Sequence, residues 1–130
     1  MSAVVLDTHV LVWWSSEPER LSPTATAAVI GASELLVSAI TWFELSWLAR
    51  HDRIVLAVPV PTWLDGLAAG VQTVGITPSI ADVAVALPAS FPTDPADRLI
   101  YATALVRGTT LVTKDRRLRK ARQPRQVTVW

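Results

Sequence analysis

The chain has 130 residues, of which 51% are hydrophobic and 18% charged, and its formal net charge is +1. This length suits one domain over residues 1–130, and the absence of cysteine excludes disulfides, thiolate metal sites and a cysteine nucleophile. No run reaches the roughly 18 apolar residues of a membrane span, and the N-terminal stretch is acidic where a signal peptide is basic. We therefore expect a cytoplasmic protein with no membrane partner.

The first half of the chain predicts two strands, each followed by helical sequence. The strands are predicted over 2–6 and 35–39, a helix or turn over 8–14, and helices over 24–32 and 41–50. Ser22 and Pro23 predict the N-cap and the first residue of the earlier helix, because a serine oxygen accepts a free amide and proline needs none.

The second half continues this alternation. We expect a helix over 62–69, a strand over 71–76, a helix over 80–87 capped by Ser79, a helix from Asp94 and Pro95 through Arg107 that Gly108 ends, a strand over 109–113, a basic helix over 116–122 and a strand over 126–130. Alternating strands and helices predict an α/β fold with a mostly parallel sheet of about five strands, covered by helices on both faces.

Four acidic residues lie in hydrophobic sequence near the ends of these strands: Asp7, Glu44, Asp97 and Asp115. Asp7 follows the first strand, Asp115 follows the fourth, and Glu44 lies one helical turn beyond the second. In a parallel sheet, ligands bind beyond the carboxyl ends of the strands. Three of the acids should therefore meet at one edge, whereas Asp97, at the start of a helix, is less firmly placed.

Each acid, taken singly, also fits a role in starting a helix. These roles are an N-cap at Asp7, a capping box of Thr41 with Glu44, a first-turn acid at Asp97 behind an N-cap at Asp94, and at Asp115 a cap or an ion pair with Arg119. As a group, carboxylates gathered in a partly dry site repel one another and need a cation. With no cysteine and two histidines, Mg²⁺ or Mn²⁺ fits better than Zn²⁺.

Four motifs resemble, in order, those of the PIN-domain ribonucleases, specifically VapC-type toxins of bacterial toxin–antitoxin pairs. They are LDTHVLVWW at 6–14, SAITWFEL at 38–45, DPADRLIYATAL at 94–105 and LVTKDRRL at 111–118. The resemblance covers essentially the whole chain. It implies a single PIN domain with a three-layer α/β/α sandwich and a metal-dependent endoribonuclease. Its implied catalytic and metal-binding acids are Asp7, Glu44, Asp97 and Asp115, with Asp94 and Thr113 in support.

For the mechanism, our hypothesis is that Asp7 and Asp97 bind Mg²⁺ most directly, with Mn²⁺ as a substitute. Glu44 and Asp115 would complete the shell through water or hold a second ion. The metal activates a water molecule for attack on the phosphodiester, which leaves a 5′-phosphate and a 3′-hydroxyl.

Basic residues are concentrated in the last fifth of the chain, and they predict contact with the RNA backbone at Lys114, Arg116 and Arg119. The alternative is an ordinary solvated helix face. Arg98, directly after Asp97, is either a contact to substrate phosphate or the partner of Asp94 in a salt bridge.

Six tryptophans in a chain this short predict apolar surface that a partner covers, and the alternative is that all six lie in the core. The stretches 13–14 and 42–47 are candidates to line a groove for an antitoxin segment or a homodimer seam. The resemblance implies both a VapB-type antitoxin and dimerisation. Two other readings remain: a Mg²⁺-binding, receiver-like phosphoacceptor domain, and a catalytically inactive RNA-binding module.

Overall fold

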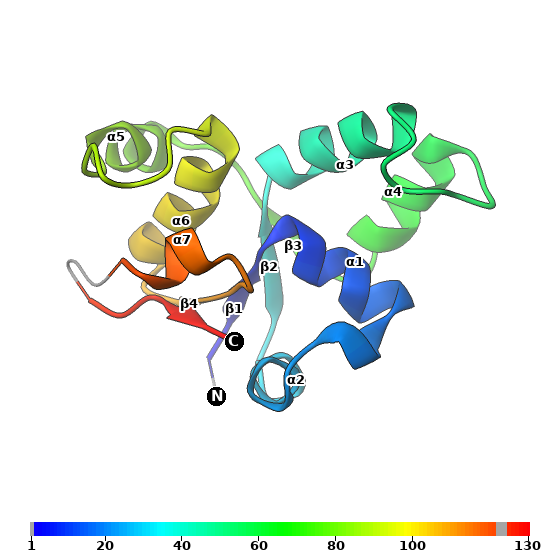
Figure 1. Cartoon of the computed structure of the whole chain (residues 1–130), viewed down its shortest axis with the longest axis horizontal. Coiled ribbons are helices and arrows are strands. Elements are labelled where there is room, and N and C mark those ends of the chain that lie inside the picture. The colour runs from blue at the N-terminus through cyan, green and yellow to red at the C-terminus, as the bar shows by residue number, and fades with distance from the viewer. Residues whose placement is uncertain (1, 122–124) are drawn as a thin grey trace.

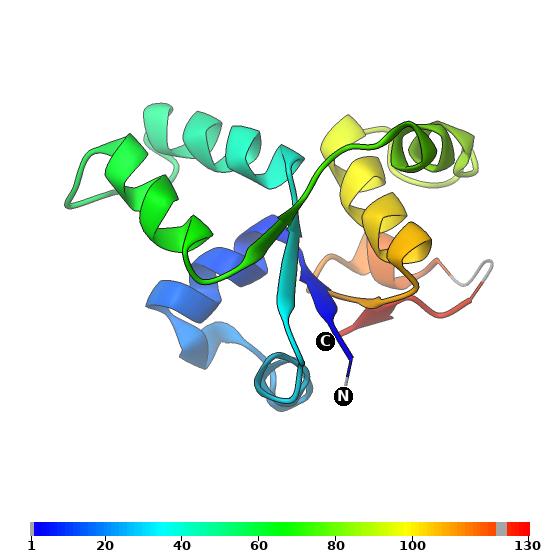
Figure 2. The same cartoon turned by 180° about the vertical axis from the view of Figure 1, so that it is seen from behind.

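A five-stranded parallel sheet forms the centre of the molecule in a computed structural model that describes residues 2–121 and 125–130 (Figures 1 and 2). The strands are β1 Val4–Leu6, β2 Leu35–Ser38, β3 Gln72–Val74, β4 Thr110–Val112 and β5 Thr128–Val129, in the order β3-β2-β1-β4-β5. Every pairing is parallel. The predicted α/β class and the number of strands are confirmed.

Helices cover both faces of this sheet, as the alternation along the sequence predicts. They are α1 Thr8–Ser16, the 3₁₀ turn η1 Pro18–Arg20, α2 Pro23–Ile30, α3 Ile40–Arg50, α4 Val60–Ala68, α5 Pro78–Ala86, α6 Pro95–Arg107 and α7 Arg116–Arg119. Figure 1 shows α5, α6 and α7 on one side of the sheet and α1, α3 and α4 on the other. The expected three-layer α/β/α sandwich is therefore the observed architecture.

Two hydrophobic cores lie against the two faces of the sheet. Val5 of β1 points into the core beneath α5 and α6, while Val4 and Leu6 point into the core beneath α1 to α4. All three are buried. Successive residues of a strand face opposite sides, so a strand covered on both faces must be apolar throughout, and this explains the uninterrupted hydrophobic run.

Helix boundaries follow the predicted caps at most positions. The Ser22 hydroxyl accepts the Ala25 amide at 3.0 Å, and Gly108 ends α6 in the left-handed region with φ of 64°. The predicted cap of α5 was wrong: Thr77 caps this helix, and Ser79 lies inside it. Pro78 takes the first helical position, which suits proline, so the cap falls one residue before it.

The C-terminal elements are shorter than predicted. The basic helix α7 ends at Arg119, and β5 holds two residues of the five expected. Position 122, where that helix was expected to end, lies outside the described residues.

The strand order reverses direction around β1, which pairs with β2 on one side and with β4 on the other. The connections from these strands leave in opposite directions, which opens a crevice beyond their carboxyl ends. The Asp7 amide donates to the Val112 carbonyl at 3.1 Å, so β1 and β4 are still paired where the first acid appears. Within the described part of the chain, every helix is too short or too polar to cross a bilayer.

Candidate metal centre

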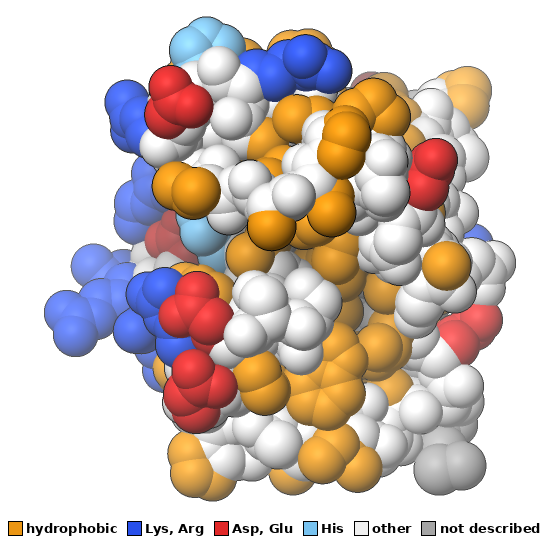
Figure 3. Space-filling model, turned by 90° about the vertical axis from the view of Figure 1, so that its right-hand side faces the viewer, with side chains coloured by type: hydrophobic (Ala, Val, Ile, Leu, Met, Phe, Trp, Pro, Cys, Tyr) orange, Lys and Arg blue, Asp and Glu red, His pale blue; other side chains and the backbone are white. Residues whose placement is uncertain are grey.

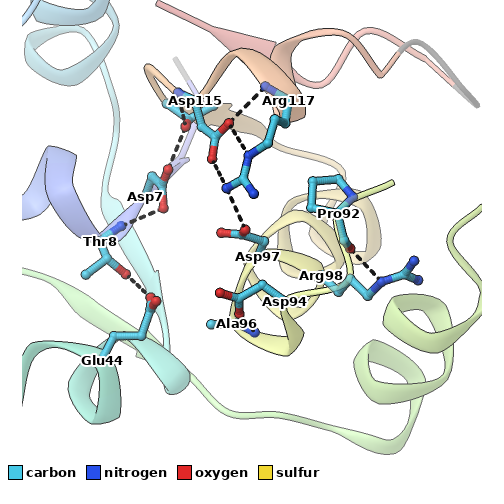
Figure 4. A network of polar contacts seen from close by, with 11 residues as sticks. Asp7, Thr8, Glu44, Pro92, Asp94, Ala96, Asp97, Arg98, Asp115 and Arg117 are labelled. Atoms are coloured by element: carbon cyan, nitrogen blue, oxygen red, sulfur yellow. Dashed lines mark hydrogen bonds and ion pairs between the residues drawn. The ribbon is translucent and has the colours of Figure 1, made fainter. Parts of the chain in front are cut away.

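All four predicted acids line one pocket at this edge of the sheet. Its charged lining residues are Asp7, Glu44, Asp94, Asp97, Asp115, Lys114 and Arg117, and Thr8, His9, Val10 and Trp13 complete it. Figure 4 shows the carboxylates approaching one another from the end of β1, from α3, from the start of α6 and from the start of α7. The predicted convergence is confirmed, and it includes Asp97, whose place was the least certain.

Asp7 is held by hydrogen bonds from two sides. Its Oδ1 accepts the Thr8 amide at 2.8 Å, and its Oδ2 accepts the Thr113 hydroxyl at 2.6 Å. The first bond makes Asp7 the N-cap of α1 as well as a pocket residue. Burial raises the pKa of Asp7, although the bond from Thr113 acts in the opposite direction.

Thr113 connects the first acid to the fourth. Its buried hydroxyl donates to Asp7 and accepts the Asp115 amide at 3.1 Å. Both hydrogen-bonding functions of the hydroxyl are thereby used. The predicted supporting position of Thr113 thus lies where it can orient two acids.

Glu44 is bound by a distant threonine. Its Oε1 accepts the Thr8 hydroxyl at 2.5 Å, across a separation of 36 residues. The predicted capping box with Thr41 was wrong, because Ala39 is the N-cap of α3 and no side chain caps it. Thr41 lies inside α3, and its buried hydroxyl is 3.2 Å from that of Thr8. Burial raises the pKa of Glu44 to about 7, and the nearby charges of Asp7 and Asp97 add to the rise.

The start of α6 contributes two acids with different surroundings. Asp94 is the predicted N-cap and accepts the Ala96 amide at 2.8 Å. Asp97 lies in the first helical turn, with 14% of its side chain exposed. Burial raises the pKa of Asp97 to about 6, and the charge of Asp94 is the next cause. A proton is therefore retained more easily at Asp97 than at an ordinary aspartate.

Asp115 differs from the other acids because an arginine neutralises it. Its Oδ1 accepts the backbone amide and the Nε of Arg117 at 2.8 and 3.1 Å, and its Oδ2 accepts Nη2 at 2.7 Å. The predicted cap of α7 is confirmed, but the ion pair involves Arg117 instead of Arg119. The bonds from Arg117 lower the pKa of Asp115. The same Nη2 also donates to Asp97 Oδ2 at 3.1 Å (Figure 4).

Arg98 points away from the pocket, and the predicted salt bridge with Asp94 was wrong. Its guanidinium donates to five backbone carbonyls, those of Ala84, Leu87, Pro88, Phe91 and Pro92. Figure 4 shows it directed away from the carboxylates of Asp94 and Asp97. The connection between α5 and α6 has many carbonyls without helical partners, and the arginine fork satisfies them in place of a phosphate or a carboxylate.

The predicted RNA-binding residues divide into two groups. Lys114 lines the acidic pocket, and its ammonium lies 5.8 Å from the ring centre of Trp13 and 6.0 Å from that of Trp130. Arg116 and Arg119 are on α7 outside the residues that line the pocket.

The chemistry of this pocket fits a hard divalent cation. Its donors are carboxylate oxygens, and three of the acids have pKa values raised by burial and by neighbouring negative charge. A bound cation removes that repulsion. As the side chains stand, however, no three His, Asp or Glu side chains among the described residues form a ready-made ion site. The guanidinium of Arg117 bridges two of the acids, so binding an ion requires side chains to move.

Two residues of the site were missed in the sequence, and both adjoin an acid. Thr8 follows Asp7 and binds Glu44, whereas Arg117 is two residues beyond Asp115 and binds Asp97. An Asp-x-Arg sequence at a helix start offers a local signal for Arg117, since a side chain there can fold back on the cap. For Thr8 the partner is set by the tertiary fold, and the sequence holds no such signal.

Comparisons with known proteins identify the family to which the chain is similar. A family model described as the PIN domain matches residues 4–124. The chain is 65% identical to Ribonuclease VapC22 of Mycobacterium tuberculosis (strain ATCC 25618 / H37Rv), over the full length of both proteins.

Solved structures share the fold at much lower identity. The DNA-bound VapBC of Salmonella typhimurium gives a TM-score of 0.72 at 19% identity, covering 99% of this chain and 98% of that one. VapBC2 of Rickettsia felis, bound to a promoter DNA fragment, gives 0.70 at 15% identity, with coverage of 98% and 97%. These likenesses extend over almost the whole chain and confirm the fold.

Proposed function

Because the chain belongs to the PIN-domain family, we propose that it is a metal-dependent endoribonuclease of the VapC type and the toxin of a toxin–antitoxin pair. The observation that carries the proposal is the convergence of five carboxylates on one pocket at the switch point of the sheet. A phosphoacceptor domain has no specific observation in its favour, and an inactive module does not need to concentrate repelling acids.

Asp7 and Asp97 are the proposed principal ligands of the metal, with Glu44 and Asp115 completing the site. PIN ribonucleases generally depend on divalent metals, and Mg²⁺ is the ion that the oxygen donors favour, with Mn²⁺ able to replace it. When bound, such an ion neutralises charge on the scissile phosphate and lowers the pKa of a coordinated water.

The chain's own residues orient this chemistry. Thr113 fixes one oxygen of Asp7 and the amide of Thr8 fixes the other, so the carboxylate cannot rotate freely. The Thr8 hydroxyl fixes Glu44 in the same way. Carboxylates held by short bonds cost little reorganisation when charge develops on the phosphate. Attack by water in this setting leaves a 5′-phosphate and a 3′-hydroxyl.

RNA is the proposed substrate, and its backbone is held by Lys114, Arg116 and Arg119. Lys114 lies at the pocket with its ammonium near two indole rings, while the two arginines extend the positive charge along α7. Contacts of this kind provide binding strength without reading sequence. We expect the reaction to take place in the cytoplasm, where the proposed RNA substrate is found.

A VapB-type antitoxin and a second copy of the chain are the proposed protein partners. Large apolar side chains are exposed on α3 and on the loop after it: Phe43 is 67% and Val55 91% exposed, and Trp47 and Val58 are also accessible. Figure 3 shows hydrophobic side chains over this side of the molecule, with Lys and Arg gathered along one edge. In the 42–47 stretch Trp42 is half-buried, so Phe43 and Trp47 carry the exposed apolar area.

The test is metal-dependent cleavage by the wild-type chain and by Asp7→Asn. Purified protein is incubated with total cellular RNA in Mg²⁺, Mn²⁺ or EDTA, and the new 5′ ends are mapped. We expect discrete cuts in either metal, none in EDTA, and a loss of at least about 100-fold in Asp7→Asn. Asp82→Asn, an exposed acid on α5, is the matched control and should cut normally. Cleavage by Asp7→Asn at the wild-type rate would refute the assignment.

A further inference from the structure

The side chain of Arg117 lies in the acidic pocket, although it belongs to a basic helix for which the sequence predicted contact with RNA or, as the alternative, a solvated face. Its Nε and Nη2 donate to the Asp115 carboxylate, and Nη2 donates again to Asp97 Oδ2 at 3.1 Å (Figure 4). The second contact crosses from α7 to α6. One guanidinium therefore joins two of the four acids proposed to serve the metal.

The pocket contains more acidic than basic side chains, which makes this contact important for its charge. The carboxylates in the lining are Asp7, Glu44, Asp94, Asp97 and Asp115, and the lysine and arginine in it are Lys114 and Arg117. The Lys114 ammonium lies over the indole rings of Trp13 and Trp130. Of these two basic residues, Arg117 is the one that forms salt bridges with the acids, Asp97 and Asp115. It provides the positive charge that the crowded carboxylates need.

We propose that Arg117 competes with the divalent metal for this pocket, in a role that rests on the proposed function. In the metal-free protein its guanidinium neutralises Asp97 and Asp115, and it withdraws when an ion binds. A guanidinium and a divalent cation at adjoining positions repel each other, and water around the exposed Arg117 screens this repulsion without abolishing it. Each cation therefore weakens the binding of the other to the acids, and to the same extent.

The surroundings of Arg117 allow such an exchange. Its side chain is 61% exposed, and exposed ion pairs are weak because water screens them. Arg117 also lines a second cavity of about 540 Å³, together with Ser90, Phe91 and Lys120. Because Arg117 lines both pockets, we place its guanidinium in this cavity when the ion binds.

The experiment measures Mn²⁺ binding by calorimetry to the wild type, to Arg117→Gln and to Arg116→Gln. Both variants lose one positive charge from the same helix, but the exposed Arg116 has no bond to the acids in the described structure. We expect Arg117→Gln to bind Mn²⁺ about 3- to 10-fold more tightly than the wild type, and Arg116→Gln to stay within about twofold. Equal effects of the two substitutions, or none, would overturn the proposal.

A second measurement follows Arg117 directly in the wild-type protein. Its Nε–H is bound to Asp115, so its NMR signal should shift as diamagnetic Mg²⁺ fills the site. A signal unchanged at saturating Mg²⁺ would also overturn the exchange. Failure of the proposed function has a different signature: if all three proteins bind no metal, the metal-dependent activity is refuted, and the role of Arg117 with it.

Discussion

Neutralising Glu44 should stabilise the metal-free protein while removing its activity. Glu44→Gln keeps an oxygen that can accept the Thr8 hydroxyl but carries no charge. Since the folded-state pKa of Glu44 is raised to about 7, its carboxylate is destabilising once it ionises. The contribution of Glu44 to the free energy of unfolding is therefore largest below its unfolded-state pKa, and it is lost as the pH rises through the folded-state pKa of about 7. The variant should therefore gain most at pH 8 and nothing at pH 4.5.

The expected gain in the free energy of unfolding follows from the rise in the pKa of Glu44. A rise from 4.5 to about 7 corresponds to roughly 3 kcal/mol of differential interaction. Glu44 is only partly buried, and screening by water reduces this to about 1–2 kcal/mol. For a chain of this length the melting temperature should rise by about 3–10 °C at pH 8.

The assay is thermal unfolding in EDTA between pH 4.5 and pH 8. Glu34→Gln, an exposed glutamate, is the control and should unfold like the wild type throughout. Adding Mg²⁺ at pH 8 should stabilise the wild type more than Glu44→Gln, because a ligand that binds only the folded state adds its binding free energy. A variant no more stable than the wild type at pH 8, or equally stabilised at pH 4.5, would show that carboxylate crowding does not strain this fold.

Three other substitutions test single features. Arg98→Ala removes the donor to five carbonyls and should lower the unfolding free energy in urea by about 2–4 kcal/mol, while the folded protein still cuts RNA; a loss of activity without a loss of stability would restore Arg98 to the site. Thr113→Val leaves Oδ2 of Asp7 and the Asp115 amide without the bonds that the hydroxyl provides, and should cost about 1–3 kcal/mol together with activity; normal cleavage would remove Thr113 from the mechanism. Arg116→Glu should weaken RNA binding and reduce the slope of log affinity against log salt by about 1–2, and an unchanged slope would contradict its phosphate contact.

The sequence predicts a helix or strand best where a capping residue, a proline or a glycine marks each of its ends. Helix α6 begins after Asp94 at Pro95 and ends at Gly108 as expected, because each of these residues has a strong local reason for its position. The start of α5 was misplaced by two residues, since Thr77 and Ser79 can both cap a helix and the proline between them decides. Local chemistry therefore fixes the existence of an element more firmly than its boundary.

The sequence predicted the acidic residues of the site, but it did not predict the side chains that form hydrogen bonds with them. Placing Asp7, Glu44 and Asp115 required only the rule that parallel strands present their carboxyl ends to one edge. The partners of Glu44 and Asp97 depend on which elements pack together, because Thr8 and Arg117 lie 36 and 20 residues away. Arg98 shows the same limit: its sequence position beside Asp97 suggested the pocket, but the direction of its side chain is set by the carbonyls it can reach.

The bond between Thr113 and Asp7 spans 106 residues and joins β4 to β1 at the centre of the sheet. Translation delivers β1 first and β4 late, after nearly every other element. A growing chain on the ribosome therefore has Asp7 long before it has Thr113 and Asp115, and cannot assemble the acidic pocket until about nine tenths of its length has emerged. For a nuclease made among the ribosomes and messages that surround it, this order means that the complete acidic pocket arrives only with a nearly finished molecule.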